Sequence, residues 1–199
     1  MSGSEAKRSE RRAREHSATR AAILDAARRV ASRDGARDLS LRAVAAEAGF
    51  APAALYGYFD GKDALLLALA AEDLSSLARA MREAVAGHQG KGKLAAASAA
   101  ALSLLRTTET MAAASAALPA RAGHGEAERL FNGRLIAVLK VLSEASGRQS
   151  DSREAQCDVL LMAATLSGLA LLARAGRLGA LGFTPEDMLG RRDTLFTGG

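Results

Sequence analysis

The stretch LRAVAAEAGFAPAALYGYF, residues 41–59, decides the fold. It predicts a short helix capped by Ser40, a tight turn at Gly49 and a second short helix that begins at Pro52 and ends near Tyr58. Proline suits the first turn of a helix because its missing N–H has no helical partner there, and glycine tolerates the positive φ of such a turn. The pattern therefore predicts a helix-turn-helix whose second helix can enter a DNA major groove. A plain helical hairpin in a bundle is the alternative.

The flanking segments complete a small helical module. A first helix is expected to start at Thr19, whose hydroxyl can cap it, and to bury Ile23, Ala27 and Val30 on one face before Gly35 ends it. A long helix, about 61–86, follows Asp60. Residues 1–18 are expected to form a basic flexible arm, because Lys7, Arg8, Arg11, Arg12 and Arg14 lie there without an apolar face.

The rest of the chain is also expected to be helical. Ala occurs 47 times, Pro three times and Trp never. This composition favours helix and argues against a large sheet. The capping signal Thr184–Asp187 predicts the start of a last helix. Glycines and Pro119 separate the further predicted helices 93–108, 110–118, 125–146, 153–175 and 185–196. We expect an all-α protein of about nine helices, with a DNA-binding domain at 19–66 and a dimerisation and effector-binding domain at 67–199.

The charge and cysteine content narrow the function. The chain has a net charge of +5, and the segment that ends at Lys62 carries 12 Lys and Arg against 8 Asp and Glu, so the excess lies in the N-terminal third. Such an excess suits a phosphate surface, although a solvated tail is an equal alternative on charge alone. The single Cys157, expected to be buried, and the charged N-terminus indicate a cytoplasmic protein. The longest uncharged run, 159–173, is too short to predict a membrane span.

The distal helices predict a subunit interface. Residues 130–142 and 159–173 are apolar nearly all round, which requires burial on every side. Ala164 and Gly168 are small enough for another helix to approach, and the final helix offers Met188 and Leu189. We expect a homodimer through the last two long helices. An ordinary intramolecular core is the alternative.

From Thr19 to Leu66 the sequence resembles the tetracycline-repressor (TetR) family of transcription regulators. The resemblance rests on Ile23, Ala26 and Ala27, on Gly35, on the series Leu41, Val44, Ala45, Ala48 and Gly49, and on Leu55-Tyr56-x-Tyr58-Phe59 followed by Lys62-Asp63-x-Leu65. It implies a dimer whose N-terminal domain binds operator DNA, which we expect to be palindromic. It also implies a C-terminal domain that usually binds a small molecule and thereby releases the DNA.

The residue types suggest DNA-binding roles. Arg42 can bond both acceptors of a guanine, Tyr56 can reach a phosphate or a base edge, and Lys62 lies where a helix N-terminus favours phosphate. Where other family members often have polar residues, this chain has Ala51, Pro52 and Ala54, so the second helix offers few polar base readers. The expected DNA-binding residues are Thr19, Ser40, Arg42, Ala51, Pro52, Ala53, Tyr56, Gly57, Tyr58 and Lys62.

The sequence defines the effector site less closely than the DNA-binding residues. Bulky apolar residues among many alanines can line a cavity, although plain core is the commoner outcome. The candidate lining residues are Leu102, Leu105, Met111, Phe131, Leu135 and Met162, with Arg106, Glu109 and Arg134 as possible polar contacts.

No motif predicts catalysis, a metal or a cofactor. Residues 87–93 have the glycine and lysine spacing of a phosphate-binding loop. However, Leu94 stands where Ser or Thr would bind Mg²⁺, and no strand precedes the loop. The three histidines and Cys157 are too far apart for metal-ligand spacing. The remaining alternative function is an all-helical small-molecule binder or scaffold whose basic face meets a partner other than DNA.

Overall fold

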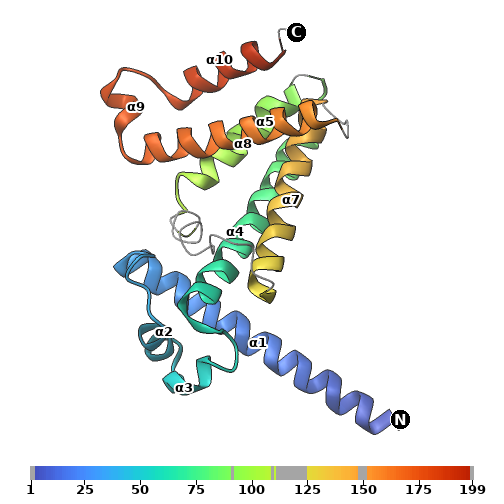
Figure 1. Ribbon diagram of the computed structural model, residues 1–199, viewed down its shortest axis with the longest axis vertical. Helices are drawn as coiled ribbons and strands as arrows, with labels where there is room; N and C mark the ends of the chain where they lie inside the picture. Colours follow the sequence, from blue (N-terminus) through green and yellow to red (C-terminus); the bar gives the residue numbers. More distant parts are fainter. Residues whose placement is uncertain (1–2, 91, 109, 111–124, 148–151, 198–199) are drawn as a thin grey trace. The chain divides into compact units, whose positions relative to one another are not determined.

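The computed structural model describes residues 3–90, 92–108, 110, 125–147 and 152–197. Within these ranges the chain forms nine helices and no strand, so the expected all-α class is confirmed (Figure 1). The chain divides into two compact units. In the described ranges, unit 1 comprises residues 3–70, 110 and 125–128, and unit 2 comprises 71–90, 92–108, 129–147 and 152–197.

Unit 1 is built around α1 (Gly3–Asp34), α2 (Leu41–Ala48), α3 (Pro52–Leu55) and the first part of α4 (Gly61–Val85). Helix α1 packs on α2, and α2 packs on α3. The predicted stripe of α1 is buried, with Ile23, Ala27 and Val30 all at 0% exposure. These side chains share one apolar core with the inward faces of α2, α3 and α4. Burial of this core fixes the two short helices, which are too short to be stable alone.

Helix α1 is longer than expected. It begins at Gly3 rather than Thr19, so that the segment expected to be a flexible arm is helical from residue 3 onward. Two ion pairs at helical spacing, Arg14–Glu10 and Arg11–Glu15, span its turns at 3.5 and 3.6 Å. A polar segment without an apolar face can therefore still be helical, because such pairs and good helix formers support it. The division of the chain at residues 18 and 66 remains a prediction.

Unit 2 contains the rest of α4 together with α5 (Gly92–Leu105), α7 (Glu126–Ser146), α8 (Arg153–Arg174), α9 (Arg177–Ala180) and α10 (Pro185–Thr197). The first residues of α7, 126–128, belong to unit 1. Helix α5 packs against α8 and α10, and α9 packs against α8. In α7 the buried positions Phe131, Val138 and Leu142 follow a helical repeat. This helix therefore buries one face rather than its whole surface.

The predicted helix boundaries in unit 2 agree with the structure to within a few residues, with two exceptions. The short helix α9 follows Gly176 and was not predicted. The predicted helix 110–118 lies outside the described residues apart from Thr110.

The expected capping box is present at the start of α10. The backbone N–H of Thr184 donates to the Asp187 carboxylate at 2.8 Å. The Thr184 hydroxyl donates to the same carboxylate at 2.7 Å. In return, the Asp187 N–H donates to the Thr184 hydroxyl at 3.1 Å. The start of this helix is therefore fixed by local sequence, as the pattern predicts.

Helix α8 exposes much of its apolar surface. Leu160, Leu161, Leu171 and Leu172 are 43–57% exposed. Cys157 is exposed as well, which corrects the expectation that it is buried. Among the described residues, α8 is the one helix long and apolar enough to cross a membrane, by length and composition only. Because it also packs against α5, α9 and α10, the same composition fits a helix that a second protein surface covers.

Candidate nucleic-acid interface

The turn between α2 and α3 is built as its residues predict. Ser40 caps α2, accepting a 3.2 Å hydrogen bond from the Ala43 N–H. Gly49 ends the helix in the left-handed conformation (φ 74°), which a side chain would strain. The Phe50 N–H then donates to the Ala45 carbonyl at 2.9 Å and closes the turn. This sequence of cap, glycine and closing bond sets the direction in which the chain enters α3.

Helix α3 is held at its end and open along its surface. Leu55 is 0% exposed and anchors the helix in the core of unit 1, whereas the adjacent Tyr56 is 66% exposed. The other exposed positions of this segment are Ala51, Pro52, Ala53, Ala54 and Gly57. Pro52 occupies the first helical position, and Ala51 provides no side-chain cap. The surface of α3 is therefore small and apolar, with one large aromatic side chain at its end.

Three polar residues expected at the interface differ in their exposure and hydrogen bonding. Arg42, the second residue of α2, is exposed. Lys62, at the start of α4, donates to the Arg37 carbonyl, which fixes its position and leaves two of its three protons for another acceptor. Thr19 does not cap a helix start: it lies inside α1, and its hydroxyl donates to the Glu15 carbonyl at 3.0 Å. The expected capping role of Thr19 is therefore wrong.

The end of α3 is also held by α1, through contacts that the sequence did not reveal. The His16 ring stacks on Tyr58 with 4.6 Å between ring centroids and 25° between planes. The Arg20 guanidinium lies over the Phe59 ring at 5.0 Å from its centroid, a cation–π geometry. Tyr58 is half-buried and Phe59 is buried, as expected of packing residues. His16 and Arg20, four residues apart on α1, thus hold Tyr58 and Phe59 in the segment that follows α3.

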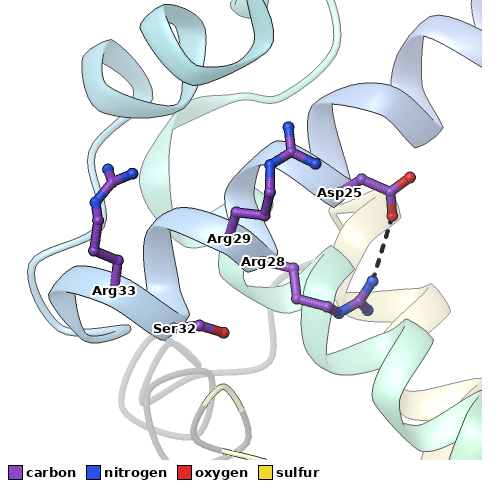
Figure 2. A pocket seen from close by; sticks show the side chains of 5 residues that line it. All are labelled: Asp25, Arg28, Arg29, Ser32 and Arg33. Carbon is purple, nitrogen blue, oxygen red and sulfur yellow. Dashed lines mark ion pairs between the residues drawn. The ribbon is translucent and has the colours of Figure 1, made fainter.

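A second set of ionic contacts joins α1 to α2. Arg29 and Arg33 donate to the two carboxylate oxygens of Glu47 at 2.7 and 3.1 Å, and these hydrogen bonds hold the pKa of Glu47 below its ordinary value. A hollow in unit 1 is lined by Arg29 and Arg33 with Asp25, Arg28 and Ser32. Figure 2 shows that these side chains diverge along α1, with Arg28 directed to Asp25 at 3.7 Å. We therefore assign this region to the support of α2.

Unit 2 contains a half-open cavity of about 500 Å³ between α5, α8 and α10. Its apolar wall includes Leu102, which is one of the expected effector residues, and Leu189. Its polar residues include Arg106, also anticipated as a polar contact, together with Arg174 and Glu186. Arg174 is positioned by a 3.0 Å hydrogen bond to the Thr108 carbonyl. Sequence reasoning missed Arg174 and Glu186, because residues from three separate helices meet here.

The other expected effector residues do not line this cavity. Phe131 and Met162 are buried in unit 2, at 3% and 0% exposure. Leu105 and Leu135 are half-buried, and Arg134 is exposed. Met111 and Glu109 lie outside the described residues. The expectation that these residues contact an effector remains a prediction.

The N-terminal third of the chain is similar to known regulatory proteins. Residues 23–69 match the family model of bacterial regulatory proteins, tetR family. The HTH-type nicotine-responsive transcriptional repressor HdnoR of Paenarthrobacter nicotinovorans is 43% identical over 67 residues, which is 34% of each chain. The aligned stretch thus spans about a third of that repressor's length.

Solved structures extend the likeness to most of the chain. Regulatory protein SCO4313 matches with a TM-score of 0.70 and 24% identity, over 94% of this chain and 98% of that one. The transcriptional regulator FadR from Bacillus subtilis, in complex with stearoyl-CoA, matches with a TM-score of 0.61 and 21% identity, over 88% and 96% of the two chains. At these identities the likeness establishes the fold.

Proposed function

We propose that this chain, whose residues 23–69 match the tetR family of bacterial regulatory proteins, is a dimeric cytoplasmic repressor released from operator DNA by a small molecule. The observation that carries the proposal is the contrast within α3, where Leu55 is fully buried and Tyr56 is 66% exposed. A helix anchored at one residue and open on the rest of its surface is what groove entry requires. No catalytic role is proposed.

The side chains around α3 divide into base and phosphate contacts. Arg42 is exposed at the front of α2 and is assigned to guanine recognition. The Ala53 methyl is assigned to a thymine methyl, while Pro52, Ala51 and Gly57 permit close approach. Tyr56 and Lys62 are assigned to the phosphate backbone, which positions the protein without reading sequence.

Three further residues support this division. The Ser40 hydroxyl accepts from the Ala43 N–H and still has its own proton to donate to a phosphate. The Tyr58 hydroxyl is available in the same way beside its stacked ring. Thr19 is half-buried with its hydroxyl bonded within α1, so its contribution to phosphate binding is the smallest of the set.

Phe50 joins this surface as a residue that sequence reasoning missed. It is 37% exposed in the turn that leads into α3. An exposed phenylalanine at this position suits apolar contact with a thymine methyl. With so few polar groups on α3, discrimination between operators rests on Arg42, on such methyl contacts and on DNA shape.

The exposed face of α8 supports the proposed homodimer. Leu161, Ala164, Gly168 and Leu171 are all exposed. They recur at spacings of three and four residues, which places them on one side of the helix. Small residues between leucines let a second helix approach closely, and a second copy of the same face would bury these leucines symmetrically. We assign the dimer contact to α8 together with α10, the last two long helices.

The cavity of unit 2 is the best-supported place for an effector. Pockets of this volume take small molecules, and a few polar groups on an apolar wall set orientation. The two arginines favour a ligand with an acidic or strongly hydrogen-bonding group, while Leu102 and Leu189 favour an apolar body. The stearoyl-CoA complex of the Bacillus subtilis regulator supports the general idea of a small-molecule effector for this fold.

Selection of bound duplexes from a random DNA pool tests the proposal. We expect an inverted repeat with half-sites about one helical turn apart, because a two-fold dimer presents two recognition helices at that spacing. Arg42→Ala should relax the preference at one base pair of each half-site, at a cost of about 1–3 kcal/mol per contact. Recovery of no enriched sequence would contradict operator binding and favour a partner other than DNA.

A further inference from the structure

The part of α1 that precedes His16 is exposed to solvent. Residues 5–15 are exposed throughout, and Figure 1 shows this part of α1 projecting beyond α2 and α3. Such a segment adds nothing to the core of unit 1. Its side chains are therefore available to contact another molecule.

The arginines of this segment fall into two groups. Arg11 and Arg14 are engaged in ion pairs with Glu15 and Glu10. Arg8 and Arg12 have no ion pair within the part of the chain that the structure describes. The helix therefore neutralises its other arginines locally and keeps these two available.

The two available arginines continue a line that already touches the recognition module. Arg8, Arg12, His16 and Arg20 follow each other at intervals of four. Because this interval exceeds one helical turn by about 40°, the line winds by about 120° around α1 between Arg20 and Arg8. His16 stacks on Tyr58, and Arg20 lies over Phe59. The line thus starts at the end of the recognition segment and runs outward along α1.

We propose that Arg8 and Arg12 form a second DNA contact, which grips the phosphate backbone beyond the base pairs read by α3. We name Arg8, Arg12, His16 and Arg20 the arginine stripe. Its two inner members fix the direction of α1, and its two outer arginines bind phosphates. From His16 to Arg8 the helix rises about 12 Å. Duplex DNA carries one phosphate charge per about 1.7 Å of axis, so both arginines can find acceptors.

This inference rests on the proposed function and adds a requirement for helical order. A disordered arm would place its charges by attraction alone and would tolerate any backbone change. The arginine stripe needs an intact helix from His16 to Arg8, because the clamp at Tyr58 and Phe59 directs the outer arginines only through a rigid backbone.

A pair of double variants tests the charge assignment. Arg8→Gln with Arg12→Gln removes the available arginines, and Arg11→Gln with Arg14→Gln removes the same charge from the ion-paired positions. The dissociation constant for a selected operator duplex is measured across salt concentrations. We expect the slope of log K against log salt to fall by about 0.9 per lost phosphate contact in the first variant and by much less in the second. Equal slopes in the two variants would overturn the stripe.

Ala13→Pro tests the requirement for a helix while keeping every charge. Proline clashes with the preceding turn and should unwind α1 before residue 13, and Ala13→Ser is the matched control that preserves the helix. We expect Ala13→Pro to lose affinity and slope as the Arg8/Arg12 variant does, with a loss of circular-dichroism helix signal. A proline variant that binds like the wild type would overturn the stripe alone. A wild-type protein that binds no duplex would overturn the proposed function and the stripe with it.

Discussion

The two units of this protein differ in which large apolar side chains they leave exposed. In unit 1 the leucines of the helix-turn-helix are buried, and the large exposed side chains are the aromatic residues Tyr56 and Phe50. In unit 2 the helix α8 leaves four leucines 43–57% exposed. Among the described residues, unit 1 thus exposes aromatic side chains as its large apolar groups, whereas α8 of unit 2 exposes leucines.

The difference indicates what each unit binds. An apolar face with small residues between leucines is suited to another helix of the same kind, because close packing removes its surface from water. A surface of small side chains beside arginines, a lysine and a tyrosine is suited to the groove and the phosphates of duplex DNA. The comparison therefore supports the proposals that unit 1 binds DNA and that unit 2 binds a second copy of the chain, and matched substitutions can test it.

The largest expected effect comes from removing a buried leucine in unit 1. Leu55 is fully buried under α3, so Leu55→Ala should cost about 2–5 kcal/mol because it leaves a cavity there. Leu181 in unit 2 is 71% exposed. Leu181→Ala is the matched control and should change stability by no more than about 0.5 kcal/mol. Thermal unfolding gives the loss of stability in both variants. Hydrogen exchange of α2 and α3 shows whether the loss in Leu55→Ala is local to these helices. Equal costs would contradict the contrast in burial.

The next effect concerns association. Leu161→Glu places a charge in the proposed dimer face of α8 and should weaken association by about 2–5 kcal/mol, since the charge is buried without a partner. Ile136→Glu makes a comparable change on α7, at a residue 65% exposed. Sedimentation velocity across protein concentrations should show monomers for the first variant and dimers for the second. Dimers in both would place the interface elsewhere.

Two serine caps allow a direct comparison of the units. Ser40 caps α2 and Ser152 caps α8, and each accepts a 3.2 Å hydrogen bond from the N–H three residues on. Ser40→Ala and Ser152→Ala should each cost about 1 kcal/mol of stability. Only the first should also weaken operator binding, because Ser40 belongs to the proposed DNA-binding surface. Equal affinities for the operator would remove Ser40 from the interface.

The smallest expected effect is a pH dependence in the link between α1 and α2. Arg29 and Arg33 lower the pKa of Glu47 through their hydrogen bonds, so the folded protein holds that proton less tightly than the unfolded chain. The resulting stability should be present above about pH 4.3, the ordinary value for glutamate, and should fade as pH falls through the lowered pKa. Glu47→Gln should remove it.

The measurement for this link is the difference in melting temperature between wild type and Glu47→Gln from pH 7 downward. We expect the difference to shrink on acidification. A double-mutant cycle with Arg33→Ala serves as control, because the two substitutions should be non-additive if the pair is coupled. Additive effects with a pH-independent difference would show that the contact contributes nothing.

The sequence predicted unit 1 better than unit 2, for a local reason. A cap at Ser40, a positive-φ glycine at Gly49 and a proline at the first helical position of α3 act within a few residues of themselves, and all three are found. The predicted start of α1 at Thr19 is wrong, because a polar segment without an apolar face can still be helical where ion pairs stabilise it.

The misses in unit 2 have a tertiary origin. Helix α9 has four residues, too few to show a periodic pattern. The exposure of Cys157 depends on which side of α8 is covered, and an apolar helix does not reveal that side. Arg106, Arg174 and Glu186 meet in one cavity only because α5, α8 and α10 pack together. Such a site depends on contacts between distant segments, which periodicity does not encode.

The exposed aromatic side chains give the most direct test of the central claim. Tyr56→Ala removes the tyrosine at the end of α3, and Phe183→Ala removes an aromatic residue 52% exposed in unit 2. Affinity for the selected operator is measured beside melting temperature and dimer state in the same samples. We predict that Tyr56→Ala loses about tenfold or more in affinity, as a contact worth about 1.4 kcal/mol or more implies, with melting temperature and dimer unchanged, while Phe183→Ala binds normally. Normal operator binding by Tyr56→Ala would contradict the assignment of α3 to DNA.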